Sequence, residues 1–160
     1  MKFYWLSALL FISFACKQSD NTTRQLQARI DSLEKKLSAT YKPGFGEFMS
    51  GIQVHHAKLW FAGINNNWEL ADFEVHEIIE ALENLQTYQL ERKETKSLPM
   101  INPAVDSVNN AIQQKDPVLF KKSYALLTSS CNNCHKAVDY SFNEVKIPET
   151  APFTNQVFTK

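Results

Sequence analysis

The residues with the clearest chemical potential are two cysteines and a histidine close together near the C-terminus. Cys131-Asn132-Asn133-Cys134-His135 is a C-x-x-C-H motif, the spacing at which c-type haem is attached to proteins. Two thiols three positions apart can form thioethers to the two vinyl groups of one porphyrin, and the adjacent imidazole can bind the iron as axial ligand. The motif therefore predicts one covalently attached haem c on Cys131, Cys134 and His135.

Two other kinds of site use a pair of cysteines at this spacing. A dithiol oxidoreductase would place its C-x-x-C next to a β-α-β pattern, which this sequence lacks. A zinc site would need a second pair of ligands at suitable spacing, and the sequence offers none. Haem attachment is the interpretation that the motif and its surroundings favour.

The third cysteine, Cys16, follows a sequence typical of an export signal. Lys2 gives a basic start, the apolar run after it is too short to span a bilayer, and the small residue Ala15 precedes the cysteine. We expect residues 1–15 to be a signal peptide and Cys16 to be acylated as in bacterial lipoproteins, anchoring the chain to a membrane in the periplasm or cell envelope. Ser13 departs from the commonest lipoprotein signal, so ordinary secretion with cleavage nearby stays open. Export agrees with haem attachment, because c-type haem is assembled on the far side of the bacterial inner membrane.

The composition favours one helical domain without a strong field of either sign. Seventeen Lys and Arg residues balance 17 Asp and Glu residues, so the formal net charge is zero. Without a basic field, nucleic-acid binding is not expected. About 145 residues remain after the signal, enough for one domain with a core. The three cysteines are all assigned, so no disulfide is expected.

Residues 16–43 predict a lipid-anchored tether followed by an amphipathic helix. Lys17 to Arg24 is polar, and apolar residues then recur at alternating intervals of four and three, at Leu26, Ile30, Leu33 and Leu37. Such a stripe suits a coiled-coil homodimer, a stalk that lifts the domain off the membrane, or a helix that packs on its own domain. These alternatives stay open.

Four further helices are predicted in residues 44–140, and together they predict an all-α, antiparallel four-helix bundle. The first runs from Phe45 to Ala62 and stops at Gly63. The second is capped by Asn66 and reaches about Leu90.

The third and fourth helices each open with a capping residue followed by proline, at Asn102-Pro103 and Asp116-Pro117. Residues 98–102 are expected to form a loop. The fourth helix keeps its four-three apolar spacing into the motif, so both motif cysteines should face the interior. Residues 141–160 lack a helical period and predict an extended tail whose aromatic residues cover an apolar surface beside the haem edge.

Four amphipathic helices with a single C-x-x-C-H motif near the end of the last one resemble the class II c-type cytochromes. In that family the cytochrome c-prime fold holds haem between the helices of an antiparallel bundle, and the resemblance covers residues 45–140. His56 to Gly63 with Asn67-Trp68, the motif itself, and Phe153 to Phe158 resemble a group of small bacterial haem-motif lipoproteins. The resemblance implies haem binding and no particular partner.

The second axial position of the iron separates an electron carrier from a gas-binding protein. In an antiparallel bundle the start of the first helix lies level with the end of the last, which places Met49 at the depth of His135. His56 is on the same stripe, about 10 Å further along the axis at 1.5 Å per residue. We expect Met49 to bind the iron, with His56 or an open site as alternatives. His55 points off the stripe and is expected to be exposed.

The second helix carries an acidic face with Glu69, Asp72, Glu74, His76, Glu77, Glu80 and Glu83. The paired Glu-x-x-His pattern of a di-iron site does not occur. We expect a solvated face that offers a docking surface to a basic redox partner.

These features predict a monohaem c-type cytochrome that transfers electrons in the bacterial envelope. No enzymatic activity of its own is expected, because a peroxidase would need a distal acid–base pair and only His56 is placed to contribute to one. A haem protein that binds or senses a small gas such as NO or CO is the first alternative. A haem-free envelope interaction module is the second.

Overall fold

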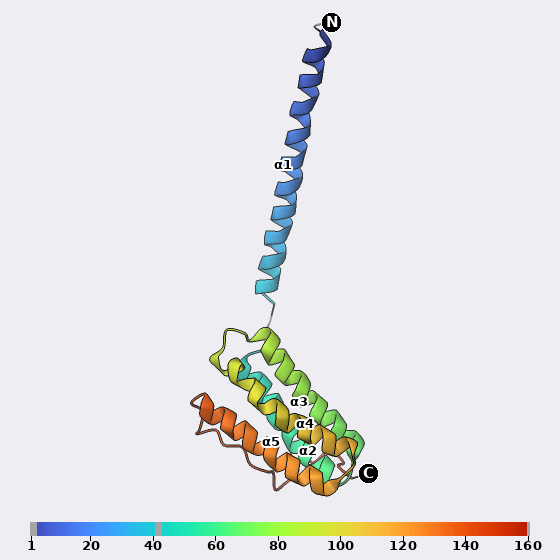
Figure 1. Ribbon diagram of the computed structural model, residues 1–160, viewed down its shortest axis with the longest axis vertical. Coiled ribbons are helices and arrows are strands. Elements are labelled where there is room, and N and C mark those ends of the chain that lie inside the picture. The colour runs from blue at the N-terminus through green and yellow to red at the C-terminus, as the bar shows by residue number, and fades with distance from the viewer. Residues whose placement is uncertain (1–2, 41–42, 160) are drawn as a thin grey trace. The chain divides into compact units, whose positions relative to one another are not determined.

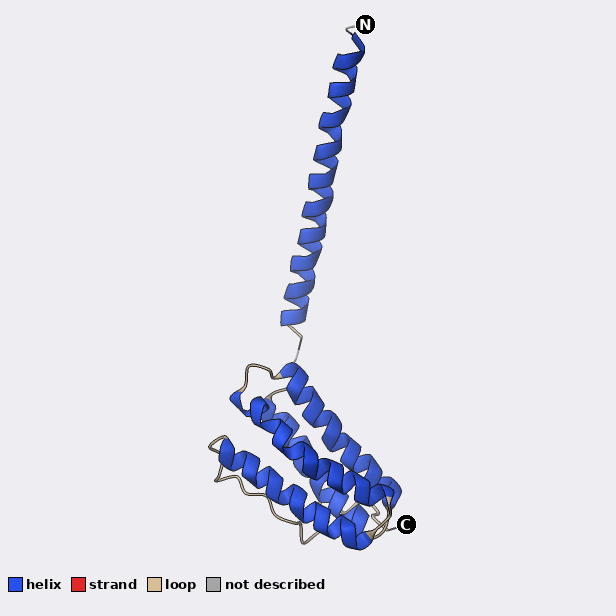
Figure 2. Cartoon of the chain, in the orientation of Figure 1, coloured by secondary structure: helices blue, strands red, loops and turns tan. Residues whose placement is uncertain are grey.

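The computed structural model describes residues 3–40 and 43–159, which form an all-helical chain (Figures 1 and 2). In chain order its elements are α1 (Phe3–Ser38), α2 (Phe45–Ile64), α3 (Trp68–Tyr88), the 3-10 helix η1 (Lys93–Ile101), α4 (Asn102–Gln113) and α5 (Pro117–Ala137). These residues contain no strand, which confirms the predicted all-α class. No helix among them is both long and apolar enough to cross a bilayer. The chain divides into two units, Met1–Lys42 and Pro43–Lys160.

The first unit contains α1, a continuous helix of 36 residues. Its sequence has no glycine or proline and includes many good helix formers such as Leu, Gln, Lys and Arg. For this reason residues 17–24, predicted as a tether, belong to the helix. Lys2 and the side chain of Cys16 lie outside the described part of the structure, so the signal peptide and the acylation stay predictions.

The second unit is built around an apolar core to which all of its helices contribute. α2 packs against α3 and α5, α4 packs against the same two helices, and η1 lies against α3, α4 and α5. The predicted stripes face this core, as the buried side chains of Leu59, Val75, Ile78, Phe120 and Tyr124 show. Apolar residues at helical spacing thus give each helix one buried face.

The turn between α2 and α3 differs by a few residues from the prediction. Gly63, predicted to end the first of these helices, lies inside α2 and is buried; a Cβ atom there would collide with the ring of Phe120. Left-handed backbone occurs instead at Asn66, with φ 57°. Asn67, not Asn66, caps α3 by accepting a hydrogen bond from the Leu70 N–H at 3.3 Å. The glycine therefore allows close packing of two elements, while asparagine tolerates the left-handed turn.

The starts of α4 and α5 match the prediction unequally. Asp116 caps α5 as predicted, because its carboxylate accepts hydrogen bonds from two N–H groups of the first turn at 2.9 and 3.0 Å. The predicted loop over residues 98–102 is wrong. It is the end of η1, and Ile101 rather than Asn102 occupies the cap position of α4. Leu98 and Ile101 are buried in the core, so their burial keeps the segment helical around Pro99.

Beyond α5, residues 138–159 contain neither helix nor strand. The ring centroids of Phe158 and Phe61 lie 5.7 Å apart, and Lys58 Nζ lies 5.7 Å from the ring centroid of Phe153. The end of the tail therefore lies on α2. Its first part, residues 140–145, reaches the cavity described next.

Candidate functional site

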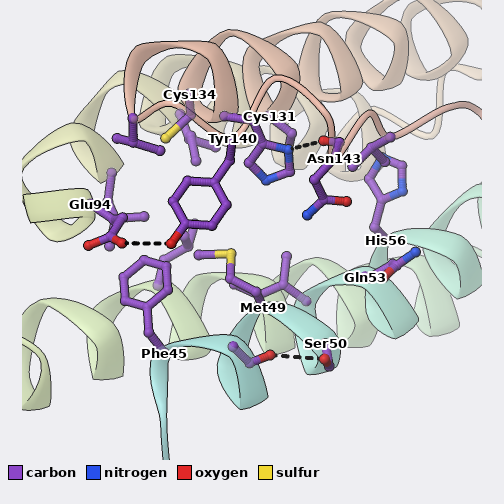
Figure 3. A pocket seen from close by; sticks show the side chains of 18 of the residues that line it. Phe45, Met49, Ser50, Gln53, His56, Glu94, Cys131, Cys134, Tyr140 and Asn143 are labelled. Atoms are coloured by element: carbon purple, nitrogen blue, oxygen red, sulfur yellow. Dashed lines mark hydrogen bonds between the residues drawn. The ribbon is translucent and has the colours of Figure 1, made fainter. Parts of the chain in front are cut away.

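One cavity in the second unit brings together the residues that the sequence singled out for chemistry. It has a volume of about 310 Å³ and is enclosed by α2, α3, η1, α5 and the segment after α5, a size typical of small-ligand pockets. Met49, His56, Cys131, Cys134 and His135 all line it. Figure 3 shows the two cysteines on the α5 side of the cavity and Met49 on the α2 side.

Both motif cysteines are free thiols on the inner face of α5. Burial raises the pKa of the Cys131 thiol to about 11, with a further contribution from Cys134, and burial also raises the pKa of Cys134. Redox dithiols and zinc sites depend on thiolates, which a lowered pKa favours. Among the described residues, no group of three or more His, Cys, Asp or Glu side chains is arranged to hold a metal ion. Burial therefore favours the protonated form of both thiols in this structure.

His135 has one ring nitrogen engaged and one available. Its Nδ1 atom lies 2.5 Å from the carbonyl oxygen of Asn143. A carbonyl oxygen only accepts hydrogen bonds, so Nδ1 carries the proton and Nε2 of the neutral ring keeps its lone pair. Histidines that bind metals are commonly held in this way by a backbone carbonyl.

The segment that carries the Asn143 carbonyl is held by a residue inside the motif. The side-chain amide of Asn132 donates a hydrogen bond to the Val145 carbonyl at 2.8 Å, and its oxygen accepts one from the Val145 N–H at 2.8 Å. This double contact links α5 to a point two residues beyond Asn143. Sequence reasoning missed both contacts, because the asparagine stands at a variable position of the motif and its partners are backbone atoms.

Met49 extends into the cavity from α2 (Figure 3). It is half-buried and packs against the apolar core. A thioether is neutral and needs no hydrogen-bond partner when it is buried. The sulfur of Met49 is therefore a soft donor available in the same cavity as His135.

His56 lines the same cavity, but both of its ring nitrogens are engaged. Nδ1 lies 2.9 Å from the Tyr124 hydroxyl and Nε2 lies 3.0 Å from the Thr128 hydroxyl. Tyr124 also donates a hydrogen bond to the His56 carbonyl at 2.7 Å. Burial lowers the pKa of His56 to about 4, so the ring is neutral near pH 7. The histidine is a hydrogen-bonded core residue in this arrangement.

Charged and hydroxyl groups gather at one end of the cavity. The Arg92 guanidinium donates two hydrogen bonds to the Glu94 carboxylate, at 2.9 and 3.2 Å, and the Tyr140 hydroxyl donates a third at 3.3 Å. The backbone N–H of Glu94 and the Arg92 guanidinium hold the pKa of that carboxyl below its usual range. All three residues line the cavity. Sequence reasoning did not single them out, because Glu94 lies in η1, which was not predicted, and the contacts join it to a residue before η1 and to one after α5.

The acidic face of α3 is solvated only in part. Its exposed members match the prediction: Glu69, His76, Glu80 and Glu83. Glu74 does not, because its carboxylate is fully buried, 2.7 Å from His55 Nδ1 and 3.4 Å from Lys58 Nζ. The predicted exposure of His55 is also wrong: its side chain is 22% exposed. The packing of α2 on α3 encloses the carboxylate, and a buried carboxylate requires partners such as these.

Comparison of the chain with protein-family models, with curated proteins and with solved structures found no match. The functional assignment therefore depends on the motif and on the geometry around it. That geometry combines two thiols, an oriented imidazole and a thioether in one largely apolar cavity.

Proposed function

We propose that this chain is a monohaem c-type cytochrome that transfers electrons in the bacterial cell envelope. The observation that carries the proposal is the state of His135: Nδ1 is engaged by the Asn143 carbonyl, and the ring lines a cavity together with Cys131, Cys134 and Met49. His135 is partly exposed, and a histidine with one nitrogen held and the other free is prepared to bind a metal. Two neutral thiols beside it supply the attachment points.

We propose an antiparallel four-helix bundle of the class II c-type cytochrome kind for α2 to α5. Support comes from the helix contacts, since α2, α3, α4 and α5 form a closed series in which each helix packs against two others. The connections from α2 to α3 and from α4 to α5 are short, three residues each, at 65–67 and 114–116. Short connections favour antiparallel neighbours.

The residues of the cavity have distinct roles in this proposal. Cys131 and Cys134 would hold the haem through two thioethers, each S–H adding across one vinyl group so that sulfur bonds to one carbon and the proton goes to the other. His135 would bind the iron through Nε2 and Met49 would bind it through sulfur. Arg92 lines the cavity while paired with Glu94, and its remaining N–H groups would be the donors for a haem propionate. The bound haem would supply one-electron redox chemistry, and the protein would orient and tune it.

The second candidate function is binding of a small gas such as NO or CO, and the arrangement around His56 favours it. Both nitrogens of that ring are engaged by Tyr124 and Thr128. If Met49 does not bind the iron, no free ring nitrogen of His56 replaces it, and the site is open for a diatomic ligand.

The envelope location depends on Cys16, whose acylation would anchor the chain to a membrane. Changing Cys16 to Ser should move the protein to the soluble fraction, because it removes the residue that would carry the acyl chains on which stable anchoring depends. The haem content should stay unchanged. Fractionation followed by a haem stain measures both. If the Ser variant stays with the membrane after a salt wash, a different feature is the anchor.

The exposed acidic residues of α3 offer a surface for a basic redox partner.

The central test is whether the haem survives denaturation. Protein made in a host with c-type haem machinery should keep its haem through acid–acetone extraction, because two thioethers hold it. Cys131→Ala or Cys134→Ala should weaken the attachment, and the double variant should abolish it. Loss of all haem from correctly exported protein would refute the proposal and leave the haem-free interaction module as the explanation.

A further inference from the structure

An apolar stripe lies exposed along the C-terminal half of α1. Its members are Leu26, Ile30, Leu33 and Leu37, each between 47 and 64% exposed. In heptad notation Leu26 and Leu33 occupy d positions, and Ile30 and Leu37 occupy a positions. The helix has no glycine or proline, so the four side chains follow one another along a single seam.

We propose that this seam binds the same seam of a second copy of the chain and forms a short parallel, in-register coiled coil. Ile30 at an a position between Leu26 and Leu33 at d positions is the arrangement that favours two parallel strands. The pairing does not depend on the proposed haem.

The charges beside the seam select the parallel orientation. In a parallel pair each g residue faces the following e residue of the other helix, so Arg29 faces Glu34 of the second copy, and the contact occurs twice. An antiparallel pair would bring g against g, which sets Arg29 against Lys36 and opposes two positive charges. Within the described residues Arg29 and Glu34 form no ion pair in their own chain, so both remain available to a partner.

The seam is too narrow for a membrane-surface helix. Such helices carry a broad apolar face with aromatic residues and a polar face rich in Lys and Arg. Here the apolar positions from residue 26 to residue 37 are restricted to a and d, apart from Ala28, and no aromatic residue occurs among them. A strict a/d stripe is the pattern of a coiled-coil seam.

Two heptads form a weak dimer in dilute solution. Two copies held on one membrane by the proposed Cys16 anchor would have a much higher effective concentration. Both helices would then leave the same surface in the same direction, as the parallel arrangement requires. This strengthening by the membrane is the only step that depends on the proposed anchor.

Cysteine cross-linking of the full chain in its own membrane tests the proposal. Leu33→Cys places a thiol in the seam, and Ala28→Cys is the matched control, because residue 28 occupies the outward f position. A short bismaleimide should join Leu33→Cys chains into a species of twice the mass, about tenfold more than Ala28→Cys chains, since d residues of the two helices are neighbours. Equal yields, or no product although both thiols react with a simple maleimide, would overturn the proposal. A product of a different mass would overturn it as well, because the partner would then be another protein.

A charge exchange tests the orientation. Arg29→Glu should reduce the cross-linking of Leu33→Cys several-fold, because it places a negative charge opposite the negative charge of Glu34 in the second copy. Adding Glu34→Arg should restore the cross-linking. If the double exchange fails to restore the product, the parallel register is wrong. A chain that cross-links as expected but loses its haem on extraction would contradict only the cytochrome assignment.

Discussion

Replacing Asn132 with alanine should loosen the segment that orients His135 while leaving every proposed haem ligand in place. The substitution removes two hydrogen bonds of 2.8 Å to Val145. A hydrogen bond of this kind contributes about 0.5–1.5 kcal/mol net, so the pair contributes about 1–3 kcal/mol. Val145 is half-buried, so water can replace part of the loss, and we expect about 1–2 kcal/mol.

This loss has three measurable consequences in the haem-loaded protein. The melting temperature should fall by about 3–8 °C for a unit of this size. The amide of Val145 should exchange about tenfold faster, since 1.4 kcal/mol is one decade in an opening equilibrium. The reduction potential should rise, because a weaker bond from Nδ1 of His135 to the Asn143 carbonyl makes the imidazole a poorer donor to ferric iron.

Asn133→Ala is the matched control. Asn133 occupies the other variable position of the same motif and is exposed. Thermal unfolding, amide exchange and a redox titration on the two variants separate a local clamp from a general effect of alanine on α5. If the two variants melt together and have the same potential, the Asn132 contact does not orient His135 and our reasoning about the proximal side is wrong.

Three further predictions concern the core and the distal side. Met49→Ala should convert a low-spin haem spectrum to high-spin, lower the reduction potential and allow rapid CO binding. Met49→Leu should have the same three effects while preserving the apolar packing at this position. A wild-type protein that is already high-spin would contradict the predictions for both variants. Burial lowers the pKa of His56 to about 4 from 6.5, so the unfolded chain takes up the proton first as the pH falls. The free energy of unfolding should therefore be at its full value above pH 6.5 and decrease by about 3 kcal/mol toward pH 4. Urea unfolding of His56→Gln should show a smaller decrease over the same pH range. Gly63→Ala forces a Cβ atom into the Phe120 ring and should cost about 1–3 kcal/mol. In the control Gly51→Ala the new Cβ atom has open space around it, so thermal unfolding should show a gain in stability of about 0.5–1 kcal/mol.

Periodicity predicted the helices well because burial of one face per helix is what fixes them. The stripe through Phe120, Tyr124 and Leu127 leads directly to Cys131 and Cys134, and all five face the interior as expected. The cap at Asp116 was predictable for a similar reason, since one carboxylate satisfies the free N–H groups of its own helix start. Such signals are local in the sequence.

Features that depend on contacts between distant segments were not predictable in this way. Gly63 resembles a helix terminator until the ring of Phe120, from α5, occupies the space beside it. Glu74 resembles a solvated acid until the packing of α2 places His55 and Lys58 against it. Each error came from assigning to local sequence a role that a second helix determines.

The two histidines of the cavity illustrate the same distinction at the site itself. From helical depth alone, His56 ranks behind Met49 because it lies two turns too far along α2, which is an argument about position. Hydrogen bonding gives an independent argument about chemistry: His56 has both nitrogens engaged, whereas His135 has only Nδ1 engaged, by a carbonyl that cannot donate. To bind iron, His56 would have to give up a bond to Tyr124 or Thr128 inside the core, at a cost of about 1–3 kcal/mol for the group left unpaired. His135 would bear no such cost, because its Nε2 atom has no hydrogen-bond partner to give up among the described residues. The preference for His135 over His56 in our proposal therefore depends on whether the second ring nitrogen is already engaged.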